Sequence, residues 1–114
     1  MDEFDIPILK KSYELFKLSY EYRFTVPKQD RYALWQRCEY TIINVLEGIL
    51  RASHLPKTEK LPVLENTSIH INCLRVFVRL AKDVKAIDNK KYVRLEGIID
   101  EIGRMIGGWI KATK

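Results

Sequence analysis

The sequence predicts an all-α fold: an antiparallel up-down-up-down four-helix bundle that forms a single domain over residues 1–114. Apolar residues recur at helical spacing in four segments, prolines and short polar stretches separate these segments, and the alternation typical of strands is absent. Short connections between amphipathic helices favour antiparallel neighbours. We expect the helices at about residues 5–23, 30–53, 60–86 and 89–111.

The first two helices follow from apolar positions that repeat every three or four residues. In the first helix the apolar face consists of Leu9, Tyr13, Phe16 and Tyr20. Asp30 is expected to cap the second helix, and Pro56 to end it. Its apolar side consists of Leu34, Trp35, Cys38, Ile42, Val45, Leu46 and Ile49, and its polar side of Arg37, Asn44, Glu47 and Arg51.

The third helix should begin between Thr58 and Leu61, because Pro62 is tolerated only in a first turn. Its inward side chains are expected to be Leu74, Phe77, Val78, Ala81 and Val84. Asp88 is a suitable N-cap for the fourth helix. The apolar face of that helix consists of Tyr92, Leu95, Ile98, Ile99, Ile102, Met105, Ile106 and Trp109.

The charge balance favours a polyanionic partner, since the chain carries a net charge of +5 and its basic excess grows toward the C-terminus. We interpret Cys38 and Cys73, which lie on apolar helical patterns, as reduced core thiols rather than a disulfide. The apolar runs are far shorter than the roughly 20 residues of a membrane helix. The acidic N-terminus is unlike a secretory signal, so we expect a cytoplasmic protein.

Residues suited to catalysis are few. A di-metal centre in a helix bundle needs two Glu-x-x-His pairs, and neither His54 nor His70 follows a glutamate by three residues. His70 and Cys73 share a helix face, but two ligands do not make a zinc site. Nothing in the sequence pairs a nucleophile with a base. We therefore expect no enzymatic activity, no metal and no cofactor, with a small hydrolase as the disfavoured alternative.

A basic stripe on the third helix is the first candidate for binding. Arg75, Arg79 and Lys82 follow one another at i, i+4 and i+7, so they share one face. Such a stripe either is a solvated surface or binds phosphates and carboxylates, for which arginine is well suited. Charge alone makes Arg37, Lys82, Arg104 and Lys111 weaker candidates.

The stretch EIGRMIGGWIK, residues 101–111, has a helical apolar pattern but contains three glycines. Each glycine costs about 1 kcal/mol relative to alanine inside a helix. Gly103 and Gly107 lie four residues apart, so another helix of the bundle or of a second subunit could pack closely there. Alternatively, the helix ends at Gly108 with a left-handed cap. Trp109 continues the apolar period and favours packing through Gly103, Gly107, Gly108 and Trp109.

The segment DEIGRMIGGWIK, residues 100–111, closely resembles the C-terminal signature of a bacterial four-helix-bundle family. That family includes proteins encoded in intervening sequences of 23S rRNA genes and the accessory variability determinant (Avd) of diversity-generating retroelements. PKQDRYALWQR, residues 27–37, is similar to the opening of the family's second helix, and LRVFVRLAKDVKAID, residues 74–88, to its third. Trp35 departs from the family, which often has a small residue at that position.

The resemblance implies a homo-oligomer, a pentamer for the retroelement members, that binds a reverse transcriptase and its template RNA or cDNA. In that setting the chain supports mutagenic reverse transcription without being an enzyme. Arg75 and Arg79 match the family's basic pair and are the first candidates for contact with nucleic acid or polymerase. The alternative is a protein of the rRNA-intervening-sequence type, with a structural or unknown role and no polymerase partner.

Overall fold

The computed structural model describes residues 5–114 and confirms an all-α four-helix bundle. The long helices are α1 (Pro7–Tyr22), α3 (Leu34–His54), α4 (Lys57–Asp83) and α5 (Asn89–Thr113). The short elements η2 (Arg23–Thr25) and α2 (Lys28–Arg31) connect α1 to α3. Within these described residues there is no strand, and no helix is long and apolar enough to cross a membrane.

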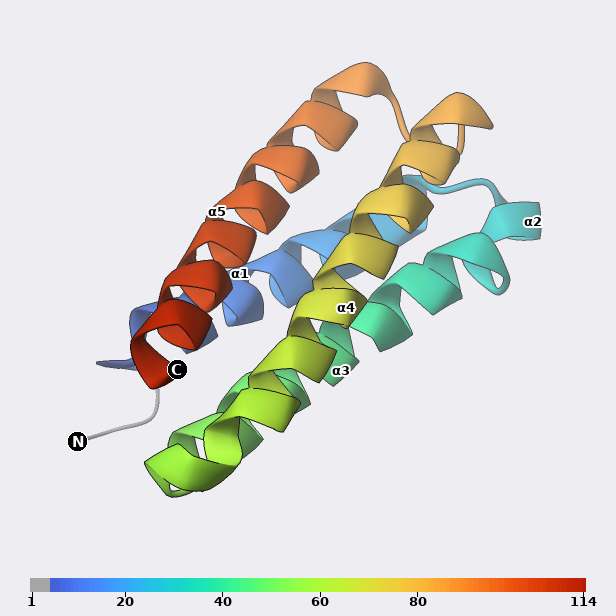
Figure 1. Cartoon of the computed structure of the whole chain (residues 1–114). Helices are drawn as coiled ribbons and strands as arrows, with labels where there is room; N and C mark the ends of the chain where they lie inside the picture. The colour runs from blue at the N-terminus through green and yellow to red at the C-terminus, as the bar shows by residue number, and fades with distance from the viewer. Residues whose placement is uncertain (1–4) are drawn as a thin grey trace.

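The four long helices lie side by side in an elongated body of 44 × 25 × 22 Å (Figure 1). In the order α1, α3, α4, α5 each helix packs against the next, and α5 returns to α1. Aliphatic side chains from all four helices, such as Leu15, Ile49, Leu74 and Ile102, fill the centre. The α4–α5 turn lies at one end of the body, and the α3–α4 turn lies at the opposite end.

The buried face of α1 differs from the expected one. Tyr13 and Tyr20 are 44% and 46% exposed, whereas the buried side chains are Ile8, Leu9, Ser12, Leu15, Leu18 and Ser19. Ser12 and Ser19 can be buried because their hydroxyls donate to the helix's own carbonyls, at Ile8 and Phe16. The expectation is confirmed for Leu9 and Phe16 and wrong for Tyr13 and Tyr20, because it counted large aromatic residues and left out small serines whose hydroxyls bond to their own helix.

The connection from α1 to α3 is also more structured than expected. Asp30 does not cap the second helix, since it lies inside α2, and α3 begins after Ala33 without a side-chain cap. The indole of Trp35, which is 1% exposed, donates to the carbonyl of Ser19 at 3.0 Å. Arg23 of η2 forms a second link to α3, with its Nη2 2.8 Å from Oε2 of the buried Glu39.

Helix α4 begins earlier and ends earlier than expected. It starts at Lys57, so Pro62 lies inside the helix rather than in its first turn. It ends at Asp83, and Val84, expected to face inward, is 51% exposed. Lys85 follows in a left-handed conformation with φ of 65°, which turns the chain toward α5. Cys73 was expected in the core and is exposed, whereas Cys38 is buried as predicted.

Helices α3 and α4 approach each other closely at one glycine. An added Cβ at Gly48 would overlap the hydroxyl of Thr67 and lie 3.2 Å from its Cβ. Thr67 is itself buried, and its hydroxyl donates to the carbonyl of Val63 at 2.8 Å. The spacing of α3 and α4 therefore depends on a glycine outside the C-terminal stretch that drew attention in the sequence.

At the start of α5 the expected cap is present, because the carboxylate of Asp88 accepts from the backbone N–H of Lys91 at 2.8 Å. The helix continues without interruption to Thr113, and no glycine among the described residues has a positive φ. Gly108 therefore does not form a left-handed cap, and that interpretation of the glycine-rich stretch is wrong.

Candidate nucleic-acid and partner interface

The basic stripe of α4 lies beside α5, and its first member is already engaged there. Nε of Arg75 is 3.3 Å from a carboxylate oxygen of Asp100, and its Nη1 donates to Asn72 at 3.1 Å. An added Cβ at Gly103 would overlap Nη2 of Arg75. Gly103 thus leaves room for the guanidinium to lie across α5, where its side chain stays 40% exposed.

Arg79 and Lys82 continue the stripe toward the α4–α5 turn. Nε of Arg79 donates to Asp83 at 3.4 Å, and this carboxylate, with a smaller contribution from Tyr92, raises the pKa of Arg79 above its ordinary value. The ammonium of Lys82 lies 4.8 Å from the centre of the Tyr92 ring. A hydrogen bond to Glu96 and burial raise the pKa of Tyr92 in turn. The charged groups of the stripe lie at the surface, but Arg75 and Arg79 are each paired with a carboxylate.

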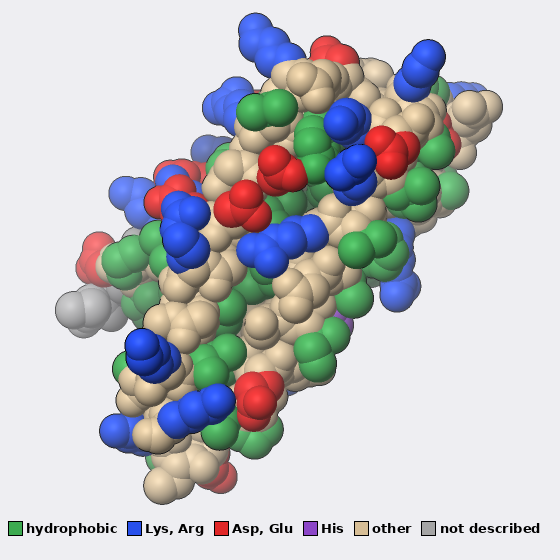
Figure 2. All heavy atoms as spheres, turned by 45° about the horizontal axis from the view of Figure 1, so that its top comes forward, with side chains coloured by type: hydrophobic (Ala, Val, Ile, Leu, Met, Phe, Trp, Pro, Cys, Tyr) green, Lys and Arg blue, Asp and Glu red, His purple; other side chains and the backbone are tan. Residues whose placement is uncertain are grey.

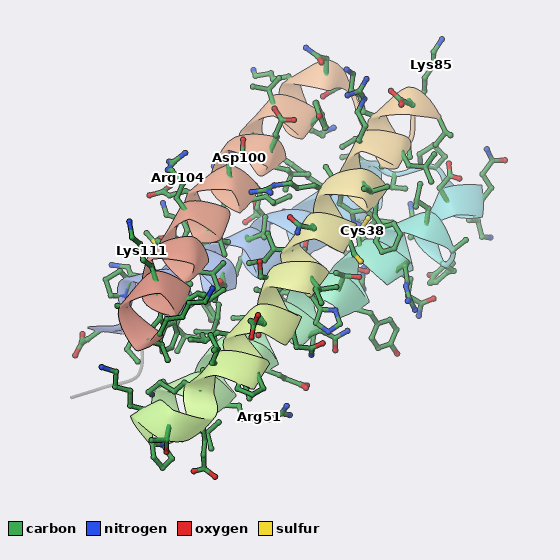
Figure 3. All side chains as sticks on the ribbon, in the orientation of Figure 1. Cys38, Arg51, Lys85, Asp100, Arg104 and Lys111 are labelled. Atoms are coloured by element: carbon green, nitrogen blue, oxygen red, sulfur yellow. The ribbon has the colours of Figure 1, made fainter. Side chains whose placement is uncertain are left out.

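The other predicted residues do not join this stripe. Arg37 is on α3, where its guanidinium lies 5.9 Å from the centre of the Phe77 ring. Arg104 and Lys111 lie two turns apart on α5 and project from the side facing away from α4 (Figure 3). The basic candidates therefore form three groups: the α4 stripe, a lone residue on α3, and the outer side of α5.

A cluster of lysines at the α4–α5 turn was not recognised from the sequence. Lys82, Lys85 and Lys91 line an open hollow of about 490 Å³, together with Thr25 and Pro27 from the α1–α3 connection. We call this hollow the lysine pocket. Lys85 projects into solvent (Figure 3) and forms no ion pair with the described part of the chain, while Lys91 lies 3.9 Å from Asp88. In the sequence these residues are spread over more than 60 positions, so spacing alone gave no signal.

Positive charge gathers at this end of the molecule. Figure 2 shows several Lys and Arg side chains projecting around the upper end, where α4 passes into α5. Farther along the same face, blue and red side chains alternate. Lysines without a neighbouring carboxylate keep their full charge for a partner. The turn therefore adds cations to the stripe, in which Arg75 and Arg79 are each paired with a carboxylate.

Four residues were expected to serve helix packing, and three of them, Gly107, Gly108 and Trp109, lie in different surroundings from Gly103. Gly107 and Gly108 are exposed, and an added Cβ at either would meet nothing within 4 Å. Trp109 is half-buried and lines an apolar depression with Ile6, Pro7, Ile8 and Met105. Of the three glycines in this stretch, close approach within the described chain accounts for Gly103 alone, and it is the side chain of Arg75 that approaches.

Residues for metal or redox chemistry are not assembled in the described chain. Among residues 5–114 no three His, Cys, Asp or Glu side chains lie close enough to share a metal ion. Burial raises the pKa of Cys38 to about 12, with a smaller contribution from Glu39, so its thiol is no nucleophile at neutral pH. The α4 stripe and the lysine pocket present a set of surface cations, including Arg75 and Arg79. A polyanion or an acidic protein can bind to such a set.

The fold and this surface define a class: a small, basic, all-α bundle whose surface offers charged groups for binding. The model of the bAvd-like family matches residues 7–113, nearly the whole chain. The chain therefore belongs to the bAvd-like family, and the resemblance seen in its C-terminal stretch is confirmed. No curated protein matches the chain.

Proposed function

We propose that this protein is a non-enzymatic accessory subunit of a diversity-generating retroelement. In this role it binds the reverse transcriptase and the template RNA or cDNA as a homo-oligomer, a pentamer by resemblance to Avd, and supports mutagenic reverse transcription in the cytoplasm. The observation that carries the proposal is membership of the bAvd-like family over residues 7–113. The net charge of +5 and the cationic α4–α5 surface agree with a nucleic-acid partner.

The lysine pocket and the adjacent stripe are the surface that we assign to nucleic acid. Lys85 and Lys91 supply charge at the turn, and Lys82 connects them to Arg79 along α4. Each neutralised phosphate of a single strand releases counterions, so the slope of log K against log salt changes by about 0.7 per contact. Such contacts are independent of sequence, which suits a protein that follows a template of changing sequence.

Binding of a single-stranded RNA, measured by fluorescence anisotropy over a range of salt concentrations, tests this assignment. We expect Lys85→Ala to weaken binding and to reduce the salt slope by about 0.7. Lys57→Ala, at the opposite end of α4, is the matched control and should change neither quantity. Arg75→Ala combined with Arg79→Ala should also weaken binding. Binding that is absent, or that does not depend on salt, would refute the electrostatic part of the proposal.

The polymerase partner is tested separately, by co-purification with the reverse transcriptase encoded beside the gene. A genomic neighbourhood without a reverse transcriptase would refute the retroelement role. It would favour the rRNA-intervening-sequence type of protein instead.

A further inference from the structure

Helix α4 carries a second apolar face that the bundle does not cover. Ile69, Val76 and Leu80 on α4 and Val84 directly after its end are 59%, 64%, 45% and 51% exposed, and the exposed Cys73 lies among them. We call these five residues the α4 outer stripe. Figure 2 shows hydrophobic side chains recurring along α4, and no other helix of the described chain has as many exposed aliphatic residues.

The spacing of the α4 outer stripe is that of a helix-packing seam. Its first four members follow one another by four, three and four residues, close to the roughly 3.6-residue period of a straight helix, so they form one row on one side of α4. The core side of α4 is a separate row, with Leu64, Ile71, Leu74, Val78 and Ala81 buried inside the bundle. A helix that is apolar on two sides is typically buried on both.

The size of the stripe supports a macromolecular occupant. Four aliphatic side chains, each about half exposed, amount to roughly 400 Å² of apolar surface, the range in which patches mark interaction sites. A stable interface takes about 800 Å² on each partner, so the stripe would supply about half of one side and its polar borders the rest. It is a row rather than a pocket, which fits a helix and not a small molecule.

The charges beside the stripe decide which occupant it fits. Two chains that each carry +5 repel each other, and they can meet only where the positive charge is locally balanced. On the α5 side of the stripe, Arg79 is paired with Asp83 and Arg75 with Asp100. Glu65, one turn before Ile69, disfavours phosphates at one end of the stripe, whereas the other end borders Lys85 of the lysine pocket.

We infer that the α4 outer stripe is the surface through which a second copy of this chain docks. The inference rests on the homo-oligomer of the proposed function and names one of the two faces that each subunit contributes to a closed ring. It also separates two tasks on one helix: the outer stripe binds another subunit, and the Arg75–Arg79–Lys82 side and the lysine pocket remain open to other partners.

The test is light scattering of the full chain with Val76→Glu and Leu80→Glu, two exposed positions where glutamate leaves the bundle core untouched. The wild type should be an oligomer, and each variant should dissociate to the monomer mass of 13.5 kDa. Burying an unpaired carboxylate should raise the dissociation constant at least about a hundredfold. Val93→Glu on α5, where the residue is 55% exposed outside the stripe, is the matched control and should keep the wild-type mass.

Alkylation of Cys73 gives a second readout, because this thiol lies in the middle of the stripe. It should react slowly in the assembled wild type and rapidly in Val76→Glu. Variants with the wild-type mass and the wild-type alkylation rate would overturn the inference while leaving the oligomer of the proposed function standing. A monomeric wild type would overturn both. If the wild type forms an oligomer that the stripe variants disrupt, but binds no RNA, only the nucleic-acid role would be refuted.

Discussion

Replacing Gly48 with alanine probes the closest contact between two helices of the bundle. The added Cβ would overlap the hydroxyl of Thr67 and lie 3.2 Å from its Cβ and 3.3 Å from its Cγ2. Thr67 is 1% exposed and cannot turn away without giving up its bond to Val63. Relief therefore requires α3 and α4 to separate, and the whole core between them to loosen.

Opposing contributions set the change in the free energy of unfolding. Alanine gains about 1 kcal/mol over glycine in a helix interior. Overpacking of a well-filled site costs about 1–3 kcal/mol, and loss of the Thr67 hydrogen bond adds about 1 kcal/mol. We expect Gly48→Ala to lower the free energy of unfolding by about 1–3 kcal/mol, the net of these terms. By contrast, Gly107→Ala meets no neighbour and should raise it by about 0.5–1 kcal/mol through propensity alone.

Urea denaturation followed by circular dichroism measures both changes. A second background makes the test specific: Thr67→Ala removes the hydroxyl and the Cγ2 that the new methyl group would meet. In that background Gly48→Ala should be much less destabilising, with a coupling of at least about 1 kcal/mol between the two sites. The same loss in both backgrounds, or a Gly48→Ala variant as stable as the wild type, would refute the reasoning.

Two further predictions concern buried polar groups. Arg23→Ala should destabilise the protein by roughly 3 kcal/mol, because it leaves the carboxylate of Glu39 buried without its partner at 2.8 Å. Thermal unfolding measures this loss of stability. The double variant with Glu39→Leu should recover much of it. Burial raises the pKa of Cys38 from 9.0 to about 12, so the neutral thiol stabilises the fold fully below pH 9, and this contribution is lost as the pH rises toward 12. Stability of the wild type should therefore fall more steeply above pH 9 than that of Cys38→Ala, and parallel curves would contradict the assignment.

Much of the fold could be predicted from the sequence, because long helices with strong apolar periods leave few alternatives. The apolar side of the second helix, from Trp35 to Ile49, was identified correctly, as was the cap at Asp88. The errors occurred where the polarity of a side chain did not indicate its burial. Ser12 is polar but buried, because its hydroxyl donates to a carbonyl of its own helix. Tyr13 was counted as apolar, but its side chain is about half exposed.

The site was harder to predict because charge patterns within one helix say nothing about neighbours. Arg75 and Arg79 were placed on one face correctly, but the pairing of Arg75 with Asp100 depends on how α5 lies against α4. The lysine pocket combines the α4–α5 turn with Thr25 and Pro27, which only the folded chain brings together. The exposed row Ile69–Cys73–Val76–Leu80 was not recognised from the sequence, although the core residues Leu74, Val78 and Ala81 of the same helix were predicted correctly.

The bond from the Trp35 indole to the Ser19 carbonyl has a consequence for how this protein tolerates change. It fixes the entry into α3 from inside the molecule, so the direction of that helix does not depend on the length of the linker before it. At the exposed residues Lys28, Gln29 and Tyr32, the linker should therefore accept inserted sequence, such as an epitope or an evolved extension, at little thermodynamic cost. Lineages could add recognition elements at this point while the scaffold stays the same.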